Sequence, residues 1–108
     1  MLSPFEVVAE PHRRRILDVL RSSEHPVTAL VQHLGLSQPA VSKHLRVLRE
    51  AGLVRTRVDA QRRLYRIEAE PLGEIDAWLA PYRTLWTHSL DKLEDHLAAM
   101  GPRDGKEN

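Results

Sequence analysis

The sequence contains no cysteine. This absence excludes disulfide bonds, thiolate metal sites, iron–sulfur clusters and a cysteine nucleophile, and nothing points to an oxidising compartment. No apolar run approaches the roughly 20 residues that a membrane span needs, and the start of the chain, MLSPFEVVAE, lacks the charged and apolar regions of a signal peptide. We therefore expect a cytoplasmic protein without a membrane-spanning segment.

Catalytic motifs are absent as well. The six histidines, with serines and carboxylates scattered among them, form no nucleophile elbow, phosphate-binding loop or H-E-x-x-H arrangement. An enzyme is therefore not expected, and no cofactor or metal is predicted. The 108 residues leave room for one compact domain, which we place at residues 1–101, followed by a disordered tail at 102–108.

The charge of the chain is unevenly distributed. The formal net charge is only +1, but residues 36–66 hold eight basic and two acidic side chains, which gives this segment +6 and leaves −5 for the rest. A basic segment on an otherwise acidic protein favours a nucleic-acid contact surface, and the alternative interpretation is an ordinary solvated face. The basic residues are Lys43, Arg46, Arg49, Arg55, Arg57, Arg62, Arg63 and Arg66.

Helices are predicted at both ends of the chain. The stretch Ser3-Pro4-Phe5-Glu6 has the form of a capping box that starts a short first helix, and Pro11 opens a second. From Pro71 onward apolar residues repeat every three or four positions, which predicts a long amphipathic helix over 71–100. Because Pro81 lies inside it, this helix is expected to be kinked or broken there.

The middle of the chain predicts a helix-turn-helix followed by a hairpin. A third helix over residues 27–34 ends at Gly35, where a left-handed C-cap is expected, and Ser37 caps a fourth helix that Gly52 closes. In residues 53–67 the apolar period changes from helical to alternating, with a polar turn, which indicates a β-hairpin with a basic tip. The predicted fold class is mainly α with a small β-hairpin.

The fourth helix has one apolar and one polar face. Val41, Leu45 and Leu48 fall on one narrow arc, whereas the opposite arc offers amide, hydroxyl, ammonium and guanidinium groups, with no carboxylate before Glu50. Such groups suit base edges and phosphates. His44 lies beside the apolar arc, where packing or a phosphate contact is favoured over base reading. The predicted DNA contacts are Ser37, Gln38, Pro39, Ser42, Lys43, His44, Arg46 and Arg49 in the helix, and Arg55, Arg57, Arg62, Arg63 and Arg66 in the hairpin.

The C-terminal apolar stripe is longer than a small core requires and contains both tryptophans. This favours an interface between two copies, to which Phe5, Val7 and Val8 would add, and the alternative is that the helix only closes the core of its own chain. A dimer also doubles the number of bases read and fixes the half-site spacing at about 34 Å. The predicted interface residues are Phe5, Val8, Leu72, Ile75, Leu79, Tyr82, Trp86, Leu90, Leu93 and Leu97.

Residues 10–70 resemble the ArsR/SmtB family of bacterial winged helix-turn-helix repressors. The resemblance is carried by Glu10-Pro11 followed by RRRIL, by LSQPAVSKHL at residues 36–45, and by Leu48 with AGLV at 51–54. It implies a winged helix-turn-helix fold and a homodimer that binds a palindromic operator, commonly as a repressor whose affinity for DNA changes with an effector.

Two departures from the family concern metal sensing. Pro26-Val27-Thr28 stands where the family's thiolate box has Cys-x-Cys, and Trp78 follows Asp76 where the C-terminal box has histidine. His88 and Asp91 come one residue out of register, so a site built from His88, Asp91, Asp95 or His96 competes with the interpretation of a solvated helix face. The pattern PL…WL…Y…W…L…L resembles the subgroup without metal-sensing boxes, which implies a metal-independent regulator whose effector is unknown.

Two functions therefore compete. The first is a dimeric, sequence-specific DNA-binding repressor. The second is a protein-interaction module that keeps the winged fold and binds another chain through its C-terminal helix.

Overall fold

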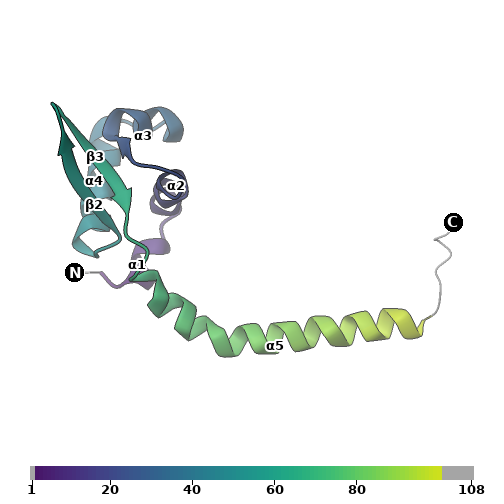
Figure 1. Ribbon diagram of the computed structural model, residues 1–108. Coiled ribbons are helices and arrows are strands. Elements are labelled where there is room, and N and C mark those ends of the chain that lie inside the picture. Colours follow the sequence, from purple (N-terminus) through teal and green to yellow (C-terminus); the bar gives the residue numbers. More distant parts are fainter. Residues whose placement is uncertain (1, 101–108) are drawn as a thin grey trace, which may run out of the picture. The chain divides into compact units, whose positions relative to one another are not determined.

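The computed structural model describes residues 2–100, so the predicted tail at 102–108 lies outside the described residues. A helix-turn-helix is followed by a hairpin and a long helix, which confirms the predicted class, mainly α with a small β-hairpin (Figure 1). In chain order the elements are α1 (Pro4–Val8), α2 (Pro11–Leu20), β1 (His25–Pro26), α3 (Val27–Leu34), α4 (Gln38–Glu50), β2 (Val54–Asp59), β3 (Arg62–Ile67) and α5 (Leu72–Ala99).

The chain divides into two compact units, and the division falls within α5. The first unit ends at Ile75 and contains α1 to α4 and the sheet, whereas the second begins at Asp76. The DNA-contact residues predicted from the sequence all belong to the first unit.

Local capping sets the helix boundaries, as the sequence predicts. The Ser3 amide donates to Glu6 Oε1 at 2.8 Å and the Glu6 amide donates to Ser3 Oγ at 3.3 Å, which completes the capping box of α1. Gly35 ends α3 with φ of +70°, a left-handed conformation that glycine adopts without a steric penalty. Ser37 Oγ accepts a hydrogen bond from the Ala40 amide at 3.3 Å and so caps α4.

The three consecutive arginines of α2 bind the ends of other helices. Arg13 Nε donates to the Val7 carbonyl at 2.8 Å, and Arg14 Nη1 donates to the Val8 carbonyl at 2.6 Å. Carbonyls at a helix C-terminus have no partner within the helix, so these cations satisfy the end of α1. Arg15 Nη2 reaches the last carbonyls of α3 in the same way, at 3.4 Å. The arginine run therefore connects α2 to the C-terminal ends of α1 and α3.

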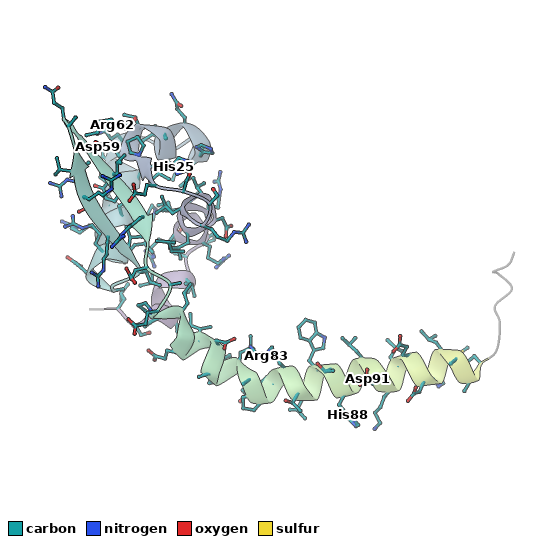
Figure 2. The ribbon with its side chains drawn as sticks, in the orientation of Figure 1. His25, Asp59, Arg62, Arg83, His88 and Asp91 are labelled. Atoms are coloured by element: carbon teal, nitrogen blue, oxygen red, sulfur yellow. The ribbon has the colours of Figure 1, made fainter. Side chains whose placement is uncertain are left out.

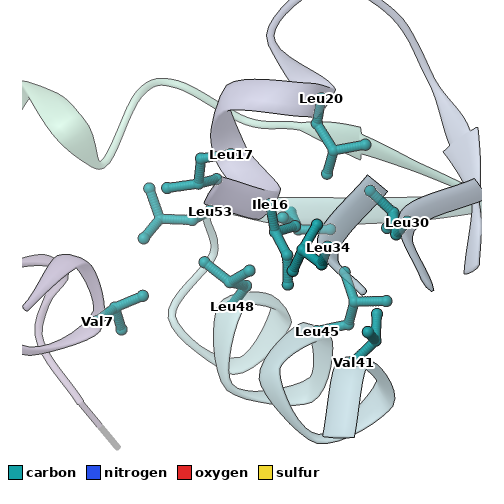
Figure 3. Close-up of a cluster of buried hydrophobic side chains, with 11 residues drawn as sticks. Val7, Ile16, Leu17, Leu20, Leu30, Leu34, Val41, Leu45, Leu48 and Leu53 are labelled. Carbon is teal, nitrogen blue, oxygen red and sulfur yellow. The ribbon is translucent and has the colours of Figure 1, made fainter. Parts of the chain in front are cut away.

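The apolar stripes of α2, α3 and α4 meet in one core (Figure 3). Val41, Leu45 and Leu48 are at most 1% exposed, which confirms the predicted buried face of α4. Removing a side chain such as Leu45 from this core should cost about 2–5 kcal/mol. Val7 is fully buried here too, so the expectation that it adds to an interface between copies is wrong, because its side chain is already used inside the chain.

The hairpin is part of a three-stranded antiparallel sheet with the order β1-β3-β2. β2 and β3 pair from Val54 opposite Ile67 to Asp59 opposite Arg62, which leaves a two-residue turn in which Ala60 has φ of +58°. β1 adds to the other side of β3. The sequence did not predict β1, because two residues carry no alternating pattern.

The long helix α5 runs as one element from Leu72 to Ala99 with Pro81 inside it. Of the two alternatives predicted at Pro81, a break into two helices is therefore not seen. Proline removes one backbone hydrogen bond, and the bonds of the neighbouring turns hold the helix together. No side chain of α5 is buried, and no described helix is long and apolar enough to cross a membrane.

Candidate nucleic-acid interface

The exposed face of α4 gathers polar and basic side chains. Burial of the apolar stripe turns this face outward, and Pro39, Ser42, Lys43, Arg46 and Arg49 line one open groove on it. Ser37 and Gln38 are exposed at the N-terminal end of the same helix. The structure thus brings seven of the eight α4 residues predicted as DNA contacts to one exposed surface.

The cations of this face are not neutralised by the chain itself. Within residues 2–100, Lys43, Arg46 and Arg49 form no ion pair with a carboxylate. An exposed cation without a carboxylate partner attracts phosphates more strongly than one already paired. The face of α4 is therefore an electrostatic surface suited to a nucleic-acid backbone.

A second open groove connects α4 to the hairpin. Arg46, Arg49 and Glu50 of the helix and Val54, Arg55 and Thr56 of β2 line it. Arg46 and Arg49 belong to both grooves, so the basic surface of α4 continues onto the outer strand of the hairpin.

Most arginines of the hairpin have carboxylate partners. Arg55 Nε lies 3.2 Å from Glu68 Oε1, and Arg62 Nη2 lies 3.5 Å from Asp59 Oδ2, next to the turn (Figure 2). Arg57 binds Glu24, and this hydrogen bond holds the pKa of Glu24 below its ordinary value and raises that of Arg57. In the described part of the chain, Arg63 and Arg66 form no ion pair.

His44 does not lie with the other α4 residues of the predicted contact set. Its side chain is only 19% exposed, with Nδ1 4.0 Å from Glu10 Oε1 and its ring centroid 5.7 Å from that of His12. Burial lowers the pKa of His44, and this outweighs the opposing effect of Glu10. A partly buried imidazole beside α2, with its pKa lowered by burial, favours the packing role considered for it over base reading.

Two residues near this surface were not singled out as sites from the sequence. Tyr65 of β3 lines the α4 groove beside Ser42 and Lys43, and its place in the alternating strand pattern could have indicated this. Glu24, by contrast, lies 33 residues from Arg57 in sequence, and no local pattern connects them.

The residues predicted for an interface between copies fall into two groups. Phe5, Val8, Leu72 and Ile75 are partly buried in the first unit, and Val8 and Leu72 pack against its core. The α5 members beyond Asp76 are exposed by 38–64%, which is unusual for large apolar side chains. This second group comprises Leu79, Tyr82, Trp86, Leu90, Leu93 and Leu97.

The histidines and carboxylates of α5 do not assemble into a site. Figure 2 shows Arg83, His88 and Asp91 on α5. The three residues line an open surface groove. Among the described residues no group of three or more His, Asp or Glu side chains is arranged to hold a metal ion. The groove carries a cation of its own, Arg83, which is paired with Asp76 at 2.7 Å.

A known protein family matches the part of the chain that contains α4. The family described as "Bacterial regulatory protein, arsR family" matches residues 10–56, from the N-cap of α2 into β2. Arsenic resistance transcriptional regulator ArsR1 of Pseudomonas putida is 40% identical over 100 residues, which cover 92% of this chain and 78% of that protein. Transcriptional repressor SdpR of Bacillus subtilis is 27% identical over 79 residues, which cover 73% of this chain and 88% of that protein. Matches to three other relatives span only 43–56% of their length.

A solved structure resembles this fold over most of the chain. The crystal structure of a possible transcriptional regulator for arsenical resistance aligns with a TM-score of 0.68 and 41% sequence identity. The alignment covers 89% of this chain and 97% of the other.

Proposed function

As a member of the arsR family of bacterial regulatory proteins, this chain is a DNA-binding transcriptional regulator, and we propose that it represses transcription by binding a palindromic operator as a homodimer. The relatives are named as regulators, which agrees with the expectation that the chain is not an enzyme. Repression is proposed because SdpR is named a repressor. A regulator of this kind acts where the chromosome is, in the cytoplasm.

One observation carries the proposal for DNA binding through α4: its exposed basic side chains have no carboxylate partner in the described chain. The N-terminal residues of a recognition helix read bases, a role that suits Gln38, Ser42 and Lys43. Arg46 and Arg49, further along the helix, suit phosphate contacts. The hairpin supplies further cations for the backbone beside the groove.

The homodimer is supported by the exposed apolar stripe of α5. One recognition helix contacts too few base pairs for specificity, whereas two copies related by a two-fold axis read two half-sites about 34 Å apart. Aromatic side chains such as Tyr82 and Trp86 are frequent anchors at protein interfaces. The same stripe also fits the second candidate function, a winged-helix module that binds another protein.

Metal-independent regulation is proposed from the donor chemistry of the chain. Soft metals prefer thiolate ligands, and the sequence has no cysteine to supply one. At the position of the thiolate box the chain has Pro26, Val27 and Thr28. The only polar side-chain group among these three residues is the hydroxyl of Thr28.

The proposal is tested by selecting genomic fragments bound by the purified protein and measuring affinity for the enriched duplex. Lys43→Gln and Arg46→Gln should each weaken binding and lower the slope of log affinity against log salt by about 0.9 for each phosphate that the variant no longer neutralises. Lys92→Gln, which removes the same charge from exposed α5, is the matched control and should change neither quantity. Equal effects of all three substitutions, or no enriched duplex, would contradict the proposal, and capture of another protein by a monomer that ignores DNA would favour the second function.

A further inference from the structure

Arg57 has the most extensive carboxylate contact of the hairpin arginines. Its Nε lies 3.0 Å and 3.1 Å from the two carboxylate oxygens of Glu24, and its Nη2 lies 2.9 Å from Oε1. Arg55 has a single contact at 3.2 Å with Glu68, which directly follows the hairpin. Glu24 is the partner that comes from a distant part of the chain.

The strand register shows how the contact is made. Arg57 of β2 is opposite Leu64 of β3, which is in turn opposite Pro26 of β1, and Glu24 directly precedes β1. The ion pair therefore crosses the middle strand and connects the two outer edges of the sheet. The fold of the first unit, not local sequence, brings the two charges together.

A carboxylate and a phosphate compete for the same side of a guanidinium group, because both accept its parallel N–H groups. While Glu24 holds Arg57, the pair has no net charge and adds little attraction for a duplex. The Arg57 side chain is nevertheless 54% exposed, and exposed ion pairs are weak, so a phosphate positioned against β2 can displace Glu24. Lys43 and Arg46 on α4 have no such partner in the described chain and attract phosphates at all times.

We propose that Glu24 is a specificity-determining residue that withholds Arg57 from the backbone of non-operator DNA and releases it when α4 seated on the operator brings a phosphate to β2. The inference rests on the proposed function. In this role Glu24, an acidic residue outside the DNA-contact surface, lowers the affinity of the protein for DNA of arbitrary sequence. On the operator, Arg57 contacts phosphate whether or not residue 24 is charged.

The test measures affinity for a labelled random-sequence duplex and for the enriched operator between 50 and 200 mM salt. For the random-sequence duplex, Glu24→Gln should steepen the slope of log affinity against log salt by about 0.9 for each released arginine. The ratio of variant affinity to parent affinity should therefore be about 3.5-fold larger at 50 mM salt than at 200 mM salt. Operator affinity should change less, so the ratio of operator to random-sequence affinity should fall. Arg57→Lys keeps the charge but loses the fork-shaped pair of N–H groups that binds Glu24. With Glu24 intact, this variant should also lower the ratio of operator to random-sequence affinity.

Two comparisons separate this role from a general charge effect. Glu70→Gln removes the same charge from an exposed residue that forms no ion pair in the described chain, and its salt slope should equal that of the parent. Glu24→Gln in an Arg57→Gln background should have no effect on binding. An equal slope change for Glu70→Gln, an unchanged slope for Glu24→Gln, or a gain that persists without Arg57 would overturn the inference. Failure of the parent protein to bind any duplex would instead refute the proposed function.

Discussion

The apolar stripe of α5 provides a prediction with a matched control inside one helix. Leu90 belongs to the predicted interface and is 50% exposed, whereas Leu85 is 64% exposed and lies outside the predicted set. At about 100° per residue, Leu90 falls within roughly 40° of Trp86 and Leu85 falls about 100° away. Leu90→Ala should therefore weaken a dimer, and Leu85→Ala should not, although Leu85 presents more apolar surface.

The size of the effect follows from the exposed fraction of Leu90. The change from leucine to alanine removes three carbons, and each contributes about 0.8 kcal/mol when it is fully buried. Because half of the Leu90 side chain is exposed in the single chain, a dimer can bury only that half, which lowers the loss to about 1.2 kcal/mol per chain. Both chains of a two-fold symmetric dimer carry the substitution, so the dimer loses about 2.4 kcal/mol of association free energy. This free energy corresponds to a dimer dissociation constant that is about 60-fold larger.

Sedimentation equilibrium at several protein concentrations measures the dissociation constant directly. Leu85→Ala should remain within about 2-fold of the parent, since an exposed leucine that stays exposed contributes little. The interpretation of α5 as the interface fails if the two variants dissociate equally, if neither changes the constant, or if the parent protein is monomeric at all concentrations measured.

Two further predictions concern the stability of the first unit. Ala60→Gly should raise the free energy of unfolding by about 0.5–1 kcal/mol, because the φ of +58° costs alanine about 1–2 kcal/mol and the greater freedom of unfolded glycine offsets only about 0.4–1 kcal/mol. Urea unfolding measures this, and an unchanged or lower value would show that the turn is unstrained. Burial lowers the pKa of His44 in the folded protein, so the unfolded chain binds the proton more tightly. The free energy of unfolding should therefore be highest above the ordinary pKa of 6.5 and should decline as the pH falls below it. His44→Gln should flatten this decline, and identical pH profiles for parent and variant would exclude His44 as its cause.

Local signals explain why α4 could be predicted from the sequence. Ser37 and Gly35 act through hydrogen bonds and backbone conformation within a few residues, so their caps are readable without the rest of the fold. The apolar arc of Val41, Leu45 and Leu48 likewise follows from the helical repeat. Because the buried face of α4 can be predicted, its exposed polar face can be predicted too.

Contacts between distant segments explain what could not be predicted. β1 is too short to show a period and exists because β3 offers it an edge. His44 is placed beside Glu10 by the packing of α4 on α2, which a helical wheel of α4 alone does not contain. The expectation for Val7 was wrong for the same reason, since its burial depends on neighbours from other helices.

The sequence by itself determined the helix-turn-helix, the hairpin and which side chains of α4 face outward, because these depend on the period of apolar residues and on caps formed by near neighbours. The tertiary structure decided which of the cations are available. Lys43 and Arg46 have no carboxylate partner in the described chain, while Arg57 meets Glu24 across the whole sheet. Charges in a sequence can be counted, but whether an opposite charge neutralises one of them depends on distances that only folding sets.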